Sequence, residues 1–161
     1  MKNVTTKVLI VDDAQSQRTL CSLFLSARCG CQCLEASCTR EALRILKTSQ
    51  VDLIISDIVR GDSQTISGSF FSKLRCFFDN WLYTLRFGAM DDGITFYRYL
   101  KSCKKYRSIP VIIISGNADT FSDFCQEVLG FGDCAMTKPF DIFCLKKIVE
   151  TLQTTGKLHE P

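Results

Sequence analysis

The sequence contains no apolar stretch that approaches the roughly 18 uncharged residues needed to cross a membrane. Its first residues run directly into a short apolar segment without a small-residue cleavage site, so we expect no signal peptide. Lysine and arginine are spread along the chain, and a formal net charge of +3 does not indicate a nucleic-acid-binding surface. We therefore expect a cytoplasmic protein, or a nuclear one in a eukaryote, that binds neither membranes nor nucleic acid.

Histidine is nearly absent, with His159 as the single residue, whereas cysteine occurs ten times. A secreted chain this rich in cysteine would predict a disulfide scaffold, but without an export signal we expect reduced thiols. Four cysteines lie close together in the sequence, as they do in some zinc sites: Cys29, Cys31, Cys33 and Cys38. The first three alternate along an extended segment and share one face of a strand, and no second CxxC or histidine lies nearby. We favour packing as small apolar residues over metal binding.

The chain has the length and composition of one domain, with 161 residues of which 46% are hydrophobic and 23% charged. The expected strands are Val8–Val11, Cys31–Ala36, Val51–Asp57, Val111–Ser115 and Asp133–Thr137, and the expected helices are Asp13–Arg28, Thr39–Ser49, Gly93–Lys104, Asp119–Leu129 and Asp141–Gln153. In the first helix, the apolar residues at helical spacing are Leu20, Leu23, Phe24 and Ala27. Strands that are continuously apolar and alternate with helices predict a parallel sheet covered on both faces.

Polar side chains stand at the carboxyl ends of these strands. They are Asp12, Asp13, Asp57, Ser115 and Lys138 in chain order. Carboxyl ends of parallel strands share one edge of a sheet, so we expect these residues to converge there. Three carboxylates form a hard-oxygen site suited to Mg²⁺, and a carboxylate can also accept a phosphoryl group. The ammonium and hydroxyl would supply the charge neutralisation and positioning that phosphoryl transfer needs.

Each of these residues has an ordinary explanation when taken singly. Asp13 could be a helix N-cap, Ser115 a loop hydroxyl, and Lys138–Pro139 a turn. Their coincidence in strand order outweighs these separate explanations.

Four segments of the chain resemble the receiver domain of two-component response regulators. They are Val8–Asp13, Leu53–Ile58, Ile112–Gly116 and Thr137–Phe140. The resemblance spans residues 7–153 apart from an inserted segment at 60–89. It implies an α/β, flavodoxin-like (βα)5 fold, a doubly wound parallel sheet of strand order 2-1-3-4-5. It also implies that Asp57 accepts a phosphoryl group from a phosphohistidine on a histidine kinase or a histidine phosphotransfer protein.

The same resemblance assigns the Mg²⁺ ligands and the switch residues. Asp13 and Asp57 would bind the metal directly, Asp12 through a water, and Val59 through its backbone carbonyl. Lys138, before a cis peptide bond to proline, would pair with the acceptor or its phosphate. Ser115 would be the hydroxyl that moves toward the phosphate and shifts the domain toward binding a downstream protein partner.

Two departures from the family pattern qualify this interpretation. Ala135 stands where the family commonly has an aromatic residue, and Gly93 follows Asp57 only after 36 positions instead of about eight. Within the insertion, residues 69–87 have the pattern of an amphipathic helix. Three explanations stay open for residues 60–89: a lid or partner-docking element, a dimerisation element near 69–87, or foreign sequence such as a retained intron.

We expect a stand-alone receiver over residues 1–161, with 154–161 as a short tail. It would be a signalling phospho-acceptor and not an enzyme, catalysing only its own phosphorylation and dephosphorylation. A degenerate receiver that only binds proteins is one alternative. A small Mg²⁺-dependent phosphatase is another, but that class places a second aspartate two residues after the nucleophile, where this chain has Val59.

Overall fold

A computed structural model describes residues 5–58, 93–116 and 125–156 of the chain. The expected insertion at 60–89, with its helical pattern, lies outside the described residues. So does most of the helix expected at Asp119–Leu129, of which residues 125–130 are described and are helical.

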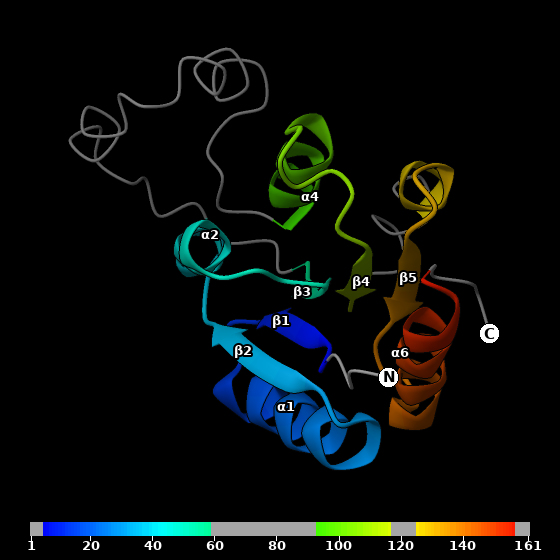
Figure 1. Cartoon of the computed structure of the whole chain (residues 1–161). Coiled ribbons are helices and arrows are strands. Elements are labelled where there is room, and N and C mark those ends of the chain that lie inside the picture. Colours follow the sequence, from blue (N-terminus) through cyan, green and yellow to red (C-terminus); the bar gives the residue numbers. More distant parts are fainter. Residues whose placement is uncertain (1–4, 59–92, 117–124, 157–161) are drawn as a thin grey trace.

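Five parallel strands form one sheet in the order β2-β1-β3-β4-β5 (Figure 1). They are β1 (Lys7–Val11), β2 (Gln32–Ala36), β3 (Leu53–Asp57), β4 (Val111–Ser115) and β5 (Cys134–Thr137). The register aligns Val8 of β1 with Cys33 on one side and Leu53 on the other. The predicted flavodoxin-like sheet with strand order 2-1-3-4-5 is confirmed.

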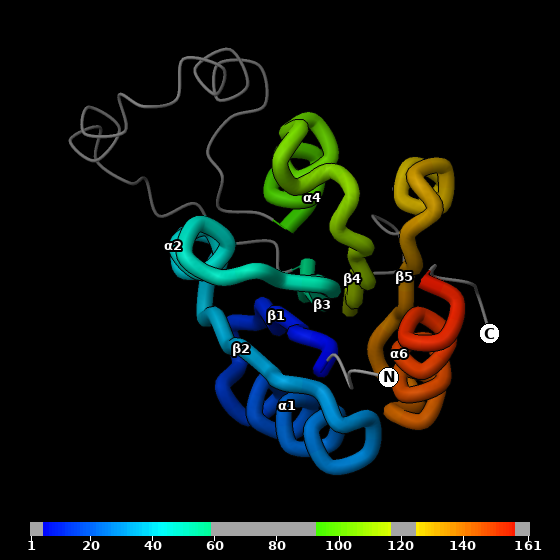
Figure 2. The backbone as a smooth tube through the Cα atoms, viewed as in Figure 1, coloured from blue at the N-terminus to red at the C-terminus, as the bar shows by residue number. Residues whose placement is uncertain are grey.

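Helices cover both faces of the sheet, with α1 (Gln15–Cys29) and α6 (Ile142–Thr155) on one side and α2 (Thr39–Thr48) and α4 (Gly93–Ser102) on the other (Figure 2). The three central strands, β1, β3 and β4, are buried on both faces because their side chains alternate between two core clusters. In β1, Leu9 packs toward α2 and α4, whereas Val8 and Ile10 pack toward α1 and α6. No described helix is long and apolar enough to span a membrane.

The buried face of α1 differs from the stripe noted in the sequence. Cys21 and Leu25, four residues apart, are buried against the sheet, whereas Leu20 and Leu23 are 61% and 66% exposed. The reason is that α1 buries only a narrow face against β1, β2 and α6, and small residues occupy part of it. The helix ends at Gly30, whose φ of 63° favours glycine and whose N–H donates to the Leu25 carbonyl.

Three of the four crowded cysteines pack into the cluster on the α1 side, whereas Cys38 is exposed at the N-cap of α2. Cys31 is buried in it, and Cys29 and Cys33 pack against its edge. Burial is the main cause that raises the pKa of the Cys31 thiol to about 12, so this thiol is protonated at neutral pH. Among the described residues, no group with the geometry to hold a metal ion includes a cysteine. These observations agree with the packing interpretation.

A buried ion pair joins α4 to the segment before β5. Lys101 Nζ lies 2.7 Å from Asp133 Oδ2, and the two side chains are 5% and 2% exposed. The Tyr97 hydroxyl donates to the same carboxylate at 2.8 Å, and the Val111 N–H donates to its other oxygen at 2.9 Å. Lys101 also donates to the Ile109 carbonyl at 2.9 Å. Nearly every polar atom of this pair therefore has a partner, as burial requires.

Candidate functional site

Two carboxylates follow β1 directly at the carboxyl edge of the sheet. The Ala14 N–H donates to Asp12 Oδ1 at 2.8 Å and so fixes that side chain in the turn. Ala14 itself is the N-cap of α1, and no side chain caps this helix. The ordinary explanation of Asp13 as an N-cap is therefore wrong, and its exposed carboxylate is free for another role.

The third carboxylate comes from the neighbouring strand. Asp57 ends β3, and its side chain is only 8% exposed. One oxygen each from Asp12, Asp13 and Asp57 can be chosen so that all three lie within 4.8 Å of one another. The parallel pairing of β1 with β3 brings these residues together although they are far apart in the sequence.

Lys138 neutralises part of this negative charge. Its Nζ lies 2.6 Å from Asp57 Oδ2 and 3.3 Å from Asp12 Oδ2. Burial raises the pKa of the Asp57 carboxyl above its ordinary value, although the ammonium opposes that rise. For Lys138, burial lowers the pKa, but the contacts with Asp57 and Asp12 outweigh it and leave the pKa raised. At neutral pH the lysine therefore stays charged beside the acids.

The end of β5 is bonded to the end of β4, where the predicted hydroxyl lies. The Lys138 N–H donates to the Ser115 carbonyl at 2.7 Å, and the peptide bond to Pro139 is cis, as expected. Ser115 is buried at the same sheet edge, one residue after the β4 position that pairs with Asp57. Ala135 is half-buried against the cluster on the α2 and α4 side, so no aromatic ring stands at that position.

The donor set fits Mg²⁺. Three carboxylates offer hard oxygen ligands in a small volume, and this ion needs only one or two of them beside waters and phosphate oxygens. Their mutual repulsion, only partly offset by Lys138, would be relieved by a divalent cation. The expected ligand at the Val59 carbonyl lies outside the described residues.

Gly93 begins α4 directly against the backbone that carries the acceptor. A Cβ atom at this position would lie 2.9 Å from the Asp57 carbonyl oxygen and 3.0 Å from the Ile58 Cα atom. These are backbone atoms that cannot move aside cheaply, so only glycine allows the helix to start so close to the site.

Arg18 is a residue of this site that was missed in the sequence. Its guanidinium Nη1 donates to the backbone carbonyls of Asp12, at 2.5 Å, and Asp13, at 3.1 Å. In the sequence, the feature that could have indicated this role is the position of Arg18, five residues after Asp13 and in the first turn of the helix that directly follows the acids.

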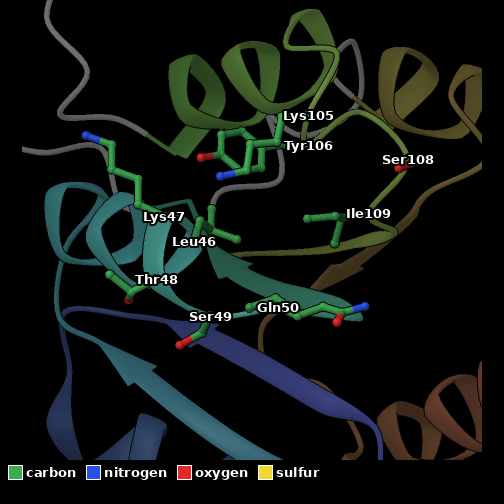
Figure 3. A pocket seen from close by; sticks show the side chains of 10 residues that line it. Leu46, Lys47, Thr48, Ser49, Gln50, Lys105, Tyr106, Ser108 and Ile109 are labelled. Atoms are coloured by element: carbon green, nitrogen blue, oxygen red, sulfur yellow. The ribbon is translucent and has the colours of Figure 1, made fainter. Parts of the chain in front are cut away.

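A separate pocket of about 460 Å³ lies at the opposite, amino-terminal ends of β3 and β4 (Figure 3). Residues 46–51, 105, 106, 108 and 109 line it. Leu46, Tyr106 and Ile109 are among its apolar residues, and Lys47 and Lys105 are among its polar ones. It contains none of the predicted site residues. The candidate chemistry therefore belongs to the open acidic edge and not to this pocket.

Comparisons with known proteins show which family and fold this chain is similar to. Residues 8–64 match the family model described as response regulator receiver domain. No curated protein matches the chain.

Solved structures give a similar result over most of the chain. The receiver domain of a signal transduction histidine kinase from Syntrophus aciditrophicus is 25% identical with a TM-score of 0.66, over 97% of this chain and 96% of that one. Chemotaxis protein CheY4 of Vibrio cholerae is 22% identical with a TM-score of 0.62, over 94% and 98%. The receiver domain of Francisella response regulator 1452 is 23% identical with a TM-score of 0.66, over 95% and 100%.

Proposed function

The chain carries a response regulator receiver domain, and from this premise we propose that Asp57 accepts a phosphoryl group from a phosphohistidine on a histidine kinase or a histidine phosphotransfer protein. The observation that carries the proposal is the largely buried carboxylate of Asp57, which lies within 4.8 Å of oxygens from two further acids and 2.6 Å from Lys138. No separate substrate is turned over in this scheme. The protein catalyses only its own phosphorylation and dephosphorylation.

The chemistry is an in-line displacement at phosphorus. A carboxylate oxygen of Asp57 forms a bond to the phosphorus while the bond from phosphorus to the imidazole nitrogen breaks, and the imidazole leaves with the electron pair. Asp12 and Asp13 would hold Mg²⁺, and the bound ion would neutralise charge on the transferring group. Lys138, already 2.6 Å from the acceptor, donates to a phosphoryl oxygen. Water later hydrolyses the acyl phosphate and restores the carboxylate.

The proposed output is a population shift at the ends of β4 and β5. A phosphoryl group on Asp57 places new negative charge beside Lys138 and near Ser115, and the backbones of these two residues are already bonded to each other. Attraction toward the phosphate would move both strand ends together and favour a state that binds a downstream protein partner. With Ala135 in place of an aromatic residue, the shift would depend on these strand ends.

The surface of α1 and α6 near the site suits a partner that carries the phosphohistidine. Leu20, Leu23 and Phe143 are 61%, 66% and 63% exposed, and an exposed patch of apolar side chains is typical of a protein contact surface. The rings of Phe24 and Phe143 meet edge to face at 5.6 Å and join the two helices into one apolar surface. Both helices begin at the acidic edge, so a protein docked on this surface would lie beside Asp57.

Leu23→Asp is expected to slow phosphoryl transfer from a phosphorylated histidine phosphotransfer protein by about tenfold or more, because it places a charge in an apolar contact. The rate with acetyl phosphate, which needs no docking surface, should change by less than about twofold. Leu129→Asp is the matched control, since Leu129 is also exposed (42%) but lies on another helical segment. Equal slowing with both donors would contradict docking on this surface.

The proposed function is tested by incubating the protein with Mg²⁺ and acetyl phosphate. The expected product carries one base-labile phosphoryl group, located on Asp57 by mass spectrometry. Asp57→Asn and excess chelator should each abolish it. If no phosphate dependent on Asp57 appears, the proposal that Asp57 is a phospho-acceptor is overturned.

A further inference from the structure

The side chain of Arg18 folds back from α1 onto the turn that carries the two acids. It is only 12% exposed, and its Nη1 donates to both backbone carbonyls of Asp12 and Asp13. Its Nε lies 3.8 Å from Glu35 Oε2 on β2, and no hydrogen bond reaches this buried nitrogen. The guanidinium is therefore placed by the two carbonyls of the turn more than by its ion-pair partner.

The two acids differ in what holds their carboxylates. Asp12 accepts from the Ala14 N–H and from Lys138. The Asp13 carboxylate is exposed and accepts no hydrogen bond from the residues that the structure describes. The backbone sets the direction of its Cα–Cβ bond, and that backbone is bonded to Arg18 at 3.1 Å.

We propose that Arg18 is a positioning residue for Mg²⁺: its guanidinium fixes the two peptide planes after β1 and so aims the Asp13 carboxylate at the metal. The inference rests on the proposed function only in naming the cation. Arg18 contacts neither the metal nor the phosphoryl group. It acts as the outer partners of metal ligands do, by holding the ligand in one orientation.

The positive charge of Arg18 works against its positioning effect, so the two must be separated. A cation near the site repels Mg²⁺, and its removal alone would strengthen metal binding. Arg18→Lys keeps the charge but replaces a planar fork of donors by a single ammonium, which cannot reproduce the same pair of bonds. A weaker metal affinity in this variant therefore reports geometry and not charge.

The experiment measures Mg²⁺ binding by calorimetry for the wild type, Arg18→Lys and the control Arg28→Lys, which changes an exposed residue in the last turn of the same helix. We expect the dissociation constant to rise about tenfold in Arg18→Lys and to stay within about twofold in the control. In phosphorylation by acetyl phosphate, the Mg²⁺ concentration for half-maximal rate should rise by the same factor. The maximal rate at saturating Mg²⁺ should be kept, which a general loss of structure would not allow.

An unchanged dissociation constant in Arg18→Lys overturns the proposal, as does a lower maximal rate at an unchanged half-saturating Mg²⁺ concentration. If Arg18→Lys does not fold, Arg18→Gln decides: weaker Mg²⁺ binding supports positioning, and tighter binding shows that charge dominates and overturns it. A wild type that binds Mg²⁺ but takes no phosphate contradicts the proposed function, and calorimetry still tests Arg18. A wild type that binds no Mg²⁺ overturns both.

Discussion

Lys138→Met is expected to reduce the rate of phosphoryl transfer to Asp57 by a factor of about 100 or more. This is the usual effect of removing one positioned hydrogen-bond donor that stabilises the charge developing in a transition state. Methionine has a similar length but no charge, so the variant should fold. It loses the ammonium that lies 2.6 Å from Asp57 and 3.3 Å from Asp12. The rate is measured with acetyl phosphate at saturating Mg²⁺.

The same variant is expected to shift the pH dependence of the reaction. Burial already raises the pKa of Asp57, and Lys138 is the group that opposes this rise. Because only the ionised carboxylate is a nucleophile, the rate falls as pH decreases through that pKa, and in the variant this fall should begin at higher pH. Because the pKa of Asp57 is higher in the folded protein than in the unfolded chain, Asp57 stabilises the fold at low pH, and this stabilisation is lost as pH rises through the folded-state pKa. The variant has the higher folded-state pKa, so the difference in the free energy of unfolding between variant and wild type should grow as pH rises.

Lys146→Met is the control for both measurements, because Lys146 is a partly exposed lysine that pairs with Glu150 within α6. It should leave the rate and its pH dependence unchanged. If Lys138→Met retained the wild-type rate, Lys138 would serve only as an ion-pair partner in the unphosphorylated protein.

Asp133→Ala is expected to lower the free energy of unfolding by about 3–5 kcal/mol, the cost of breaking one side of a buried ion pair. The variant leaves the ammonium of Lys101 buried without its counter-charge. The Tyr97 hydroxyl and the Val111 N–H lose their acceptor at the same time. Urea unfolding followed by circular dichroism measures the change.

The control for this prediction is Asp141→Ala, which removes an aspartate whose hydrogen bond is exposed to solvent. Asp141 is the N-cap of α6 and accepts from the Phe143 N–H at 2.9 Å. Its loss should cost about 1 kcal/mol. A loss of similar size at Asp133 would mean that water or another side chain relieves the buried ammonium of Lys101.

The pattern of residues was sufficient to predict a parallel sheet and the meeting of the acids, and the resemblance to receiver domains implied the strand order. Short, continuously apolar strands alternating with helices leave few topologies, and each of the predicted side chains stands at a carboxyl end. The prediction was weaker for α1, where Leu20 and Leu23 fit a helical stripe but are exposed. Periodicity marks an apolar stripe, but it does not say whether the stripe faces the core or a partner.

Interactions between distant parts of the chain were the ones that the sequence could not predict. Lys101 follows Leu100 in an amphipathic helix, and nothing local indicates that its ammonium is buried against Asp133. Arg18 likewise fits the pattern of an ordinary polar helix residue. In both cases the role depends on a tertiary neighbour, which a local pattern does not identify.

The close approach of Gly93 to Ile58 has a consequence for the length of chain between them. The chain leaves the sheet at Ile58, after β3, and returns at Gly93, where α4 begins, and these two residues are in contact. The segment between them is therefore a loop whose two ends meet. The entropic cost of closing such a loop grows only with the logarithm of its length, by about 0.6 kcal/mol for each doubling. The framework around Asp57 is therefore nearly indifferent to how many residues this loop contains, and sequence can be added there or removed at little cost to folding.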